Sequence, residues 1–200
     1  MSIGPEVIDG MARTRKRIVV GISGSSAPHL GHMFLQVSRD LADVETHLVV
    51  SEGARRSLDL EMGVAPSELE RLADVVYDPT NMGAAVSSGS FLTTGMVVIP
   101  CSMRTLAAIA TGNSDNLVTR AADVTLKERR RLVLVTRETP LSYIHLTNMQ
   151  TVTLAGAVVL PPVPAFYHRP KTIDDLLKHV CGKVLDQFGI EHECFTRWTS

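Results

Sequence analysis

Short apolar runs alternate with amphipathic segments along almost the whole chain of 200 residues. The runs of strand type are residues 16–22, 45–50, 96–100, 132–135 and 157–160, and helical periodicity follows each of them. Strands that are connected through helices pair in parallel, and their crossovers cover both faces of the sheet. The alternation therefore predicts a three-layer, doubly wound α/β fold of the Rossmann-like type with a mostly parallel sheet.

Length and composition fit a single domain of this kind. A chain of 200 residues buries a core without disulfides or metal, and 44% hydrophobic against 20% charged residues indicates neither disorder nor a membrane protein. We expect the domain to span residues 16–200, after a flexible tail of residues 1–15. The tail lacks the apolar core of a signal peptide, and no later run is long enough to span a bilayer. We therefore expect a cytoplasmic protein without membrane contact.

Charge and cysteine usage narrow the possible partners. A net charge of -1 supplies no basic field, so we expect no nucleic acid. The three cysteines show neither CxxC nor Cys/His spacing, which argues against a metal site and suits a reducing compartment. Cys101 could be a nucleophile, but it follows a strand-terminal proline and has no obvious histidine partner. A buried small residue is its favoured role.

Two strand-to-helix turns are rich in small and hydroxylated residues. The first turn contains Gly24, Ser25 and Ser26, and the second contains Ser102, Met103, Arg104 and Thr105. Backbone N–H groups, hydroxyls and a helix amino terminus together favour a phosphate group. The absence of GxGxxG and of a Walker lysine disfavours a dinucleotide, and such turns also occur without a ligand. Two turns at one sheet edge predict a site for a phosphate-bearing or planar cofactor.

A charged pair follows the apolar strand 132–135. Arg137 and Glu138 come directly after it, and Lys127 precedes it closely in sequence. A guanidinium suits phosphate, a carboxylate accepts a proton, and the lysine adds a second cation. We interpret this stretch as an anion-handling active site, although the same residues are equally compatible with a solvated charged turn.

Two further loops draw attention to aromatic side chains. Phe91 lies in the long loop 81–95, where it is as suited to anchoring the loop in the core as to touching a ligand. Residues 161–170 contain four prolines, which hold the loop extended and present Phe166 and Tyr167 in a fixed geometry. The last residues, with the single tryptophan Trp198, are hydrophobic enough that we expect them to pack on the body or on a neighbour.

Seven segments, in this order, resemble the UbiX-type flavin prenyltransferases and the small subunits of hydroxyarylic acid decarboxylase systems. They are GISGSS (21–26), SSGSF (87–91), PCSMRT (100–105), TRAADVTLKERR (119–130), LVTRETPL (134–141), LPPVPAFYHRP (160–170) and LDQFGI (185–190). The similarity extends from Arg17 to Trp198. It identifies the chain as a member of this flavoprotein family.

The resemblance implies an enzyme that binds reduced FMN and joins to it a dimethylallyl group from dimethylallyl phosphate or pyrophosphate. The product, prenylated FMN, would serve a UbiD-type decarboxylase. The family pattern also implies trimers that assemble into dodecamers, active sites at subunit interfaces, and transfer without a metal.

The resemblance further implies roles for individual residues. The implied catalytic residues are Glu138, the favoured proton acceptor or donor, with Lys127, Ser26 and Glu61. The implied FMN-binding residues are Gly24, Ser25, Ser26, Ser51, Ser102, Met103, Arg104, Thr105, Arg120 and Arg137. The implied contacts of the prenyl donor are Tyr167, Lys183, Lys127 and Phe91.

The chain departs from the family pattern in its first turn. Ala27 stands where glycine is usual, which restricts the backbone if a positive φ is required there. Glu52 follows Ser51 where lysine is common, and a carboxylate near phosphate weakens binding unless it points away. Two alternatives to prenyl transfer therefore stay open. They are an FMN-dependent decarboxylase of the cysteine type and a flavin-binding carrier subunit without transferase activity.

Overall fold

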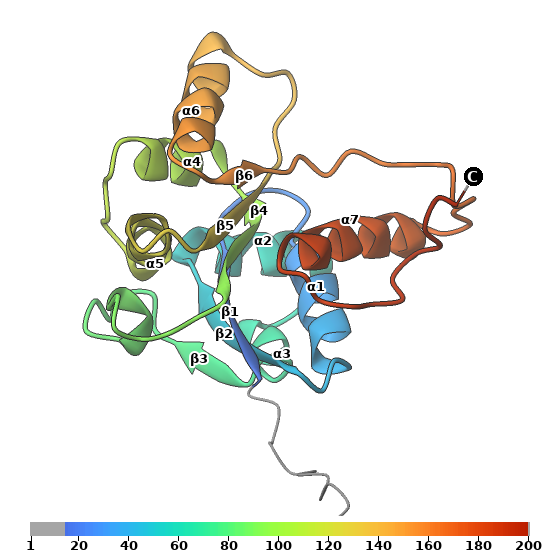
Figure 1. The fold of residues 1–200 in the computed structure, drawn as a ribbon, viewed down its shortest axis with the longest axis horizontal. Coiled ribbons are helices and arrows are strands. Elements are labelled where there is room, and N and C mark those ends of the chain that lie inside the picture. Colours follow the sequence, from blue (N-terminus) through green and yellow to red (C-terminus); the bar gives the residue numbers. More distant parts are fainter. Residues whose placement is uncertain (1–14, 200) are drawn as a thin grey trace, which may run out of the picture.

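The computed structural model describes residues 15–199, which fold around one six-stranded, all-parallel sheet (Figure 1). The strand order is β3-β2-β1-β4-β5-β6, which is the doubly wound arrangement predicted from the sequence. The strands are β1 (Lys16–Ile22), β2 (Val44–Val50), β3 (Val75–Tyr77), β4 (Gly95–Cys101), β5 (Arg131–Thr136) and β6 (Val158–Val159). Except for Arg15, the predicted tail of residues 1–15 lies outside the described residues.

Helices on both faces of the sheet complete the three layers. One face is covered by α1 (His29–Arg39), α2 (Glu52–Met62), α3 (Pro66–Glu70) and α7 (Ile173–Gln187). The other is covered by the 3-10 helix η1 (Ala85–Ser87), α4 (Met103–Ala110), α5 (Leu117–Lys127) and α6 (Tyr143–Leu154). The period-two pattern of β1 serves both layers, because Ile18 and Val20 enter the first core and Val19 enters the second.

Two elements differ from the sequence-based expectation. The strand β3 is not predicted, because three half-buried or exposed residues at a sheet edge form no apolar run of ordinary length. Amphipathic periodicity predicts a helix over residues 113–127, whereas α5 begins at Leu117. Asn116 ends the preceding loop by capping the helix, since its Oδ1 accepts hydrogen bonds from the N–H groups of Val118 (2.9 Å) and Thr119 (3.2 Å).

The carboxyl-terminal residues pack on α7, as the sequence predicts. Asp186 on α7 receives hydrogen bonds from Arg197 (2.7 Å) and is bonded to His192 (3.2 Å). The ring of Phe195 lies so close to Gly182 that a Cβ there would be 2.6 Å from it. Helix α7 in turn packs on α1, and the carboxyl-terminal residues thus belong to the body of the protein.

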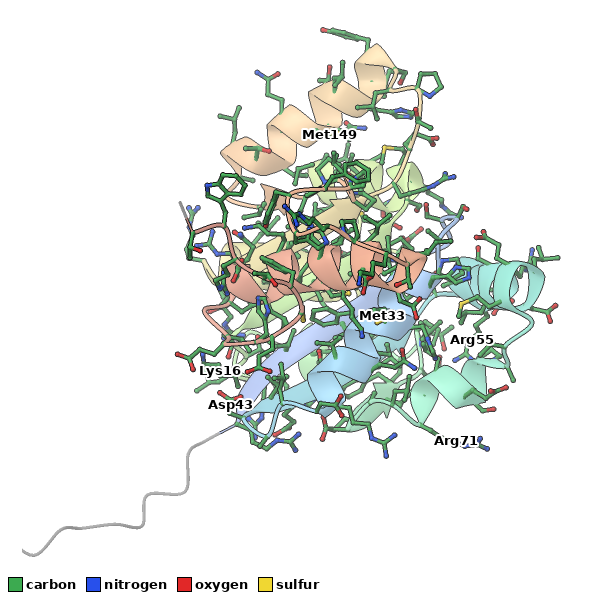
Figure 2. The ribbon with its side chains drawn as sticks, turned by 90° about the vertical axis from the view of Figure 1, so that its right-hand side faces the viewer. Lys16, Met33, Asp43, Arg55, Arg71 and Met149 are labelled. Carbon is green, nitrogen blue, oxygen red and sulfur yellow. The ribbon has the colours of Figure 1, made fainter. Side chains whose placement is uncertain are left out.

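Helix α6 packs on α4 and projects from one end of the molecule, where Figure 2 labels Met149. Val152 is its single buried residue, whereas Tyr143, Ile144 and Leu154 are 68–83% exposed. No helix among residues 15–199 is both long enough and apolar enough to cross a membrane.

Candidate active site

Ser23 ties the ends of β1 and β4 together where the two predicted phosphate turns begin. Its buried hydroxyl donates to the carbonyl of Pro100 (3.0 Å) and accepts a hydrogen bond from the N–H of Ser102 (2.8 Å). A hydroxyl that is satisfied in both roles holds its surroundings in one arrangement. Both turns therefore start from a fixed point at the carboxyl edge of the sheet.

Serine side chains cap the helices that leave this edge. Ser51 Oγ accepts a hydrogen bond from the N–H of Ala54 (3.2 Å) at the start of α2. At the start of α4, Ser102 Oγ accepts from the N–H of Thr105 (3.2 Å). Each cap uses one of the free N–H groups of its helix, and the others retain the partial positive charge that favours an anion.

The turn after β1 passes directly over the start of α2. A Cβ on Gly24 would lie 2.8 Å from the carbonyl carbon of Gly53, and a Cβ on Gly53 would lie 3.2 Å from the Cα of Gly24. Two backbones approach this closely only where neither residue carries a side chain. The backbone N–H groups of the turn after β1 and of the start of α2 therefore lie close together.

Glu61 lies at the end of α2 and binds the last residues of the loop that follows β1. Its Oε2 accepts hydrogen bonds from the hydroxyl of Ser26 (3.0 Å) and from the N–H of Ala27 (2.9 Å). Ala27 has a φ of 67°, which costs a non-glycine residue roughly 1–2 kcal/mol. Ser26 and Glu61 are both predicted to be catalytic. In this chain they are hydrogen-bonded to each other, and Glu61 also stabilises the strained backbone of Ala27.

A cavity of about 560 Å³ opens at this edge of the sheet. It is lined by residues from the turns after β1, β2, β3, β4 and β5 and from the segment before α5. These residues are Gly24, Ser51, Glu52, Gly53, Pro79, Thr80, Ser102, Met103, Arg104, Thr105, Asp115, Asn116 and Glu138. The fold thus brings most of the predicted turn residues together with Glu138.

Glu138 reaches the cavity from the end of β5. The preceding residue is fixed by its backbone, because the N–H of Arg137 donates to the carbonyl of Cys101 (3.2 Å) and its carbonyl accepts from Ser25 Oγ (3.3 Å). The exposed carboxylate of Glu138 accepts a hydrogen bond from the N–H of Thr139 (3.0 Å) through Oε1, which leaves Oε2 available to a proton.

Burial raises the pKa of Cys101 to about 12, in agreement with a structural role for this thiol.

Three predicted site residues lie outside this cavity, along α5 and the loop beside it. Arg120 Nε donates to the carbonyl of Ser87 (3.3 Å), and Lys127 pairs with Glu128 beside Gly89. The ring of Phe91 lies under the guanidinium of Arg17 (5.2 Å), near the start of β1. These residues form a group around loop 87–91.

Within one chain, Lys127 and Glu138 lie at different ends of β5. Lys127 precedes β5, and Glu138 follows it. The six residues of this strand span roughly 20 Å, so the two residues lie toward opposite edges of the sheet.

The remaining predicted pair, Tyr167 and Lys183, lies on the α7 side of the molecule. The hydroxyl of Tyr167 is 3.2 Å from Nε2 of His179, and Lys183 follows His179 by one helical turn. Lys183 also forms an ion pair with Asp186 (3.3 Å). Helix α7 therefore gathers a phenol and an ammonium group in a third location.

Comparison with known proteins assigns the chain to a family. The flavoprotein family model matches residues 9–185. The flavin prenyltransferase UbiX of Escherichia coli K12 is 52% identical over 185 residues, which cover 92% of this chain and 98% of that protein. This chain belongs to the UbiX family of flavin prenyltransferases. The prediction from the seven sequence segments is confirmed.

Solved structures agree with the assignment. A crystal structure of AnUbiX in complex with FMN and dimethylallyl pyrophosphate is 52% identical, with a TM-score of 0.90 over 93% of this chain and 98% of that one. A dodecameric FMN-dependent UbiX-like decarboxylase from Escherichia coli O157:H7 is 49% identical, with a TM-score of 0.89 over 92% and 100% of the two chains. The peptidyl-cysteine decarboxylase EpiD, at 14% identity, shares the fold alone.

The donor set of this UbiX-family chain fits a phosphate-bearing cofactor. The crowded pair of glycines leaves no room for a side chain, and the capped amino termini of α2 and α4 meet the same cavity. Glu52 lines the cavity too, but it forms an ion pair with Arg56 (3.7 Å), which offsets part of its charge. Arg104 is paired with Asp115 (3.6 Å) while its side chain remains 90% exposed.

Several residues that line the cavity at the carboxyl edge were not predicted from the sequence. Thr80 enters the cavity because it follows the unpredicted strand β3, and Asn116 enters it as the cap of α5. The Asn at the start of a helical pattern was a signal for such a cap. No local sequence pattern pointed to Gly53, because its role depends on its contact with Gly24.

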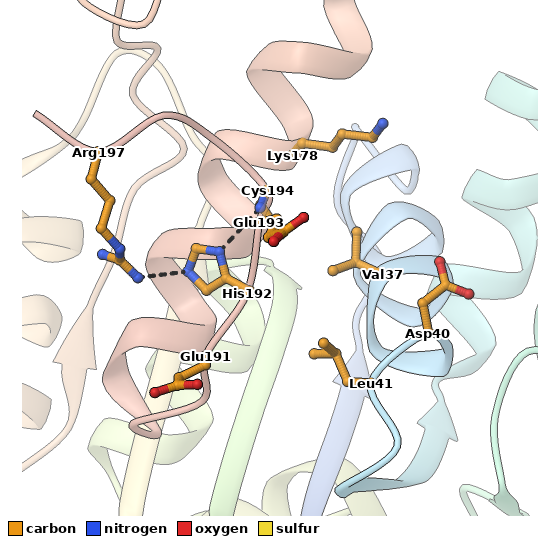
Figure 3. A pocket seen from close by; sticks show the side chains of 9 residues that line it. All are labelled: Val37, Asp40, Leu41, Lys178, Glu191, His192, Glu193, Cys194 and Arg197. Carbon is orange, nitrogen blue, oxygen red and sulfur yellow. Dashed lines mark hydrogen bonds between the residues drawn. The ribbon is translucent and has the colours of Figure 1, made fainter.

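A larger cavity, of about 830 Å³, lies elsewhere (Figure 3). It is bounded by the end of α1, by Lys178 of α7 and by residues 191–197. None of the predicted site residues lines it. In this cavity, the imidazole of His192 is bonded to Arg197 (3.4 Å) and to the N–H of Cys194 (3.2 Å), as Figure 3 shows.

Proposed function

We propose that this chain joins a dimethylallyl group from dimethylallyl phosphate or pyrophosphate to reduced FMN and thereby makes prenylated FMN. The observation that carries the proposal is the cavity at the carboxyl edge, where phosphate-binding turns and the carboxylate of Glu138 face one space. The crystal structure of the 52% identical AnUbiX with FMN and dimethylallyl pyrophosphate supports both ligands.

The turns around Gly24, Ser51 and Ser102 would hold the FMN phosphate through backbone N–H groups and hydroxyls. Bound reduced FMN supplies the nucleophilic ring atoms to which the prenyl group is joined. Arg137, fixed through its backbone to β4, would place a cation at the flavin. Closure of a new ring requires that a proton leave a ring carbon, and Glu138 has a free oxygen to accept it.

Departure of the phosphate requires donors and cations directed at the developing charge. Lys127, Lys183 and the hydroxyl of Tyr167 have this chemistry, and no metal is then required. In one chain they lie apart from Glu138. We therefore infer that complete sites form between subunits, with Lys127 and Glu138 contributed by different copies.

The exposed surface of α6 supports assembly into a homo-oligomer. Tyr143, Ile144 and Leu154 would bury apolar area in contact with a second copy. The UbiX-like protein from Escherichia coli O157:H7 is dodecameric. We propose trimers that assemble further into a dodecamer, and a UbiD-type decarboxylase as the recipient of the product.

An anaerobic incubation with reduced FMN and dimethylallyl phosphate, followed by mass spectrometry of the released flavin, tests this function. We expect a mass gain of one dimethylallyl unit that is lost in Glu138→Gln and kept in the matched control Glu193→Gln, which changes a carboxylate in the larger cavity. A parallel reaction with the pyrophosphate identifies the preferred donor. Tightly bound but unmodified FMN with both donors would reject the transferase and leave the carrier function.

A further inference from the structure

His179 is a buried side chain that the sequence did not single out. It lies on α7, is 7% exposed, and its Nε2 is 3.2 Å from the hydroxyl of Tyr167. The two rings meet edge to face, with centroids 5.7 Å apart. The contact joins the middle of α7 to the proline-rich loop and thereby fixes the direction of the phenol.

The other sides of the His179 ring are packed by aromatic rings. The imidazole of His168 stacks on it at 4.9 Å with an angle of 5°, and the ring of Phe195 lies at 4.7 Å. Among residues 15–199, no group is hydrogen-bonded to Nδ1 of His179. Tyr167 is therefore the polar partner that this imidazole has within the described chain.

Charge and burial decide the protonation of His179. Burial, followed by the proximity of His168 and Lys183, lowers its pKa, and Asp186 opposes this effect only in part. The imidazole is therefore neutral near pH 7 and carries one N–H. A buried N–H without a partner is rarer than a buried acceptor without one, so the hydrogen belongs on Nε2.

The Nε2 hydrogen then points to the oxygen of Tyr167. Because that oxygen accepts from His179, the phenol keeps its own proton for a different acceptor. The ammonium group of Lys183 lies one turn further along α7, where it pairs with Asp186 (3.3 Å). A phenolic donor suits an anionic oxygen.

We propose that His179 is a positioning residue that orients Tyr167 so that the phenol donates its proton to the phosphate of the prenyl donor. The inference rests on the proposed function, and in particular on the assignment of Tyr167 to the phosphate. His179 acts through Tyr167 and need not touch the donor itself.

Three variants of His179 separate this role from simple ring packing. His179→Phe keeps an aromatic ring on α7 and removes the hydrogen bond. His179→Gln places an amide N–H near the position of Nε2, whereas the shorter His179→Asn places it near Nδ1. Since Gln and Asn are both polar amides, their difference reports the hydrogen bond to Tyr167 even if His179→Phe fails to fold.

The experiment measures the affinity of the FMN-loaded protein for dimethylallyl phosphate by calorimetry, together with KM and kcat. We expect Tyr167→Phe, His179→Phe and His179→Asn each to weaken donor binding by about tenfold, with FMN affinity unchanged. His179→Gln should restore most of the loss. In the Tyr167→Phe background, His179→Phe should add no further effect, because the two residues act as one unit.

The inference is overturned if His179→Phe and His179→Asn bind the donor as the wild type does, or if the losses of Tyr167→Phe and His179→Phe add. It is also overturned if Tyr167→Phe has no effect on donor binding. The binding cycle is independent of prenyl transfer, which the mass measurement on the wild-type protein tests separately. Failure of the proposed function and failure of this inference are thus distinguishable.

Discussion

Gly24 and Gly53 are in contact through their backbones, and a methyl group added to Gly24 would lie 2.8 Å from the carbonyl carbon of Gly53. The reverse substitution is less severe, because a Cβ on Gly53 would be 3.2 Å from the Cα of Gly24. The two positions thus differ in how far the turns after β1 and β2 must move to admit a side chain.

Gly24→Ala is expected to lower FMN affinity by at least about tenfold, because the turn after β1 must move away from the start of α2. Gly53→Ala should have a smaller effect. Gly83→Ala is the control, since its added Cβ meets only the side chain of Asn81 at 3.4 Å. Fluorescence titration with FMN provides the measurement. Equal affinities of all three variants would contradict the proposal that the turns around Gly24 and Gly53 hold the FMN phosphate.

Ala27→Gly is expected to stabilise the protein by about 0.5–1 kcal/mol. The gain from relieving a φ of 67° exceeds the entropy that glycine adds to the unfolded chain. Urea unfolding of the FMN-free protein at constant protein concentration measures the change. The control is Ala108→Gly on α4, where the same substitution in a helix should destabilise by roughly 1 kcal/mol.

Chains that carry Lys127→Ala and chains that carry Glu138→Gln should each be inactive alone and recover activity when they are co-expressed. If a site takes these residues from different subunits, random mixing leaves about a quarter of the sites intact. The flavin mass assay measures the recovery. No recovery, in mixed oligomers shown to contain both chains, would mean that one chain supplies both residues.

Ile144→Arg is expected to convert the assembly into smaller species, because it places a charge on the apolar surface of α6. Ser67→Arg on α3 is the matched control, since it adds the same side chain at an exposed polar position. Light scattering coupled to size-exclusion chromatography gives the mass of each variant. An unchanged mass for Ile144→Arg would remove α6 from the interface.

Stability should decrease as the pH falls below about 6.5. The folded state lowers the pKa of His179, chiefly through burial, and that of His32, chiefly through burial and then through His29. The unfolded chain therefore binds more protons than the folded one in this range. Unfolding in urea between pH 8 and pH 5 measures the slope, which should be smaller in His179→Gln. An identical slope would show that His179 does not titrate as inferred.

The sequence by itself determined the class of fold and the core of the site. Apolar periodicity and turn chemistry are local properties, so they predicted β1, β2, β4, β5 and the helices between them. The presence of Gly24, Ser51 and Ser102 in one cavity also followed, because the carboxyl ends of parallel strands meet at one edge. Strand β3 was missed, since three half-buried or exposed residues carry too little pattern.

Only the tertiary structure decided how the remaining residues are grouped. Lys127 and Glu138 are eleven positions apart, yet the extended strand between them places them at opposite edges of the sheet. Tyr167 and His179 lie in a loop and a helix, and their hydrogen bond exists because α7 folds back under the proline-rich segment. Distances in space between side chains depend on how the elements pack, and this information is not contained in any local stretch of the chain.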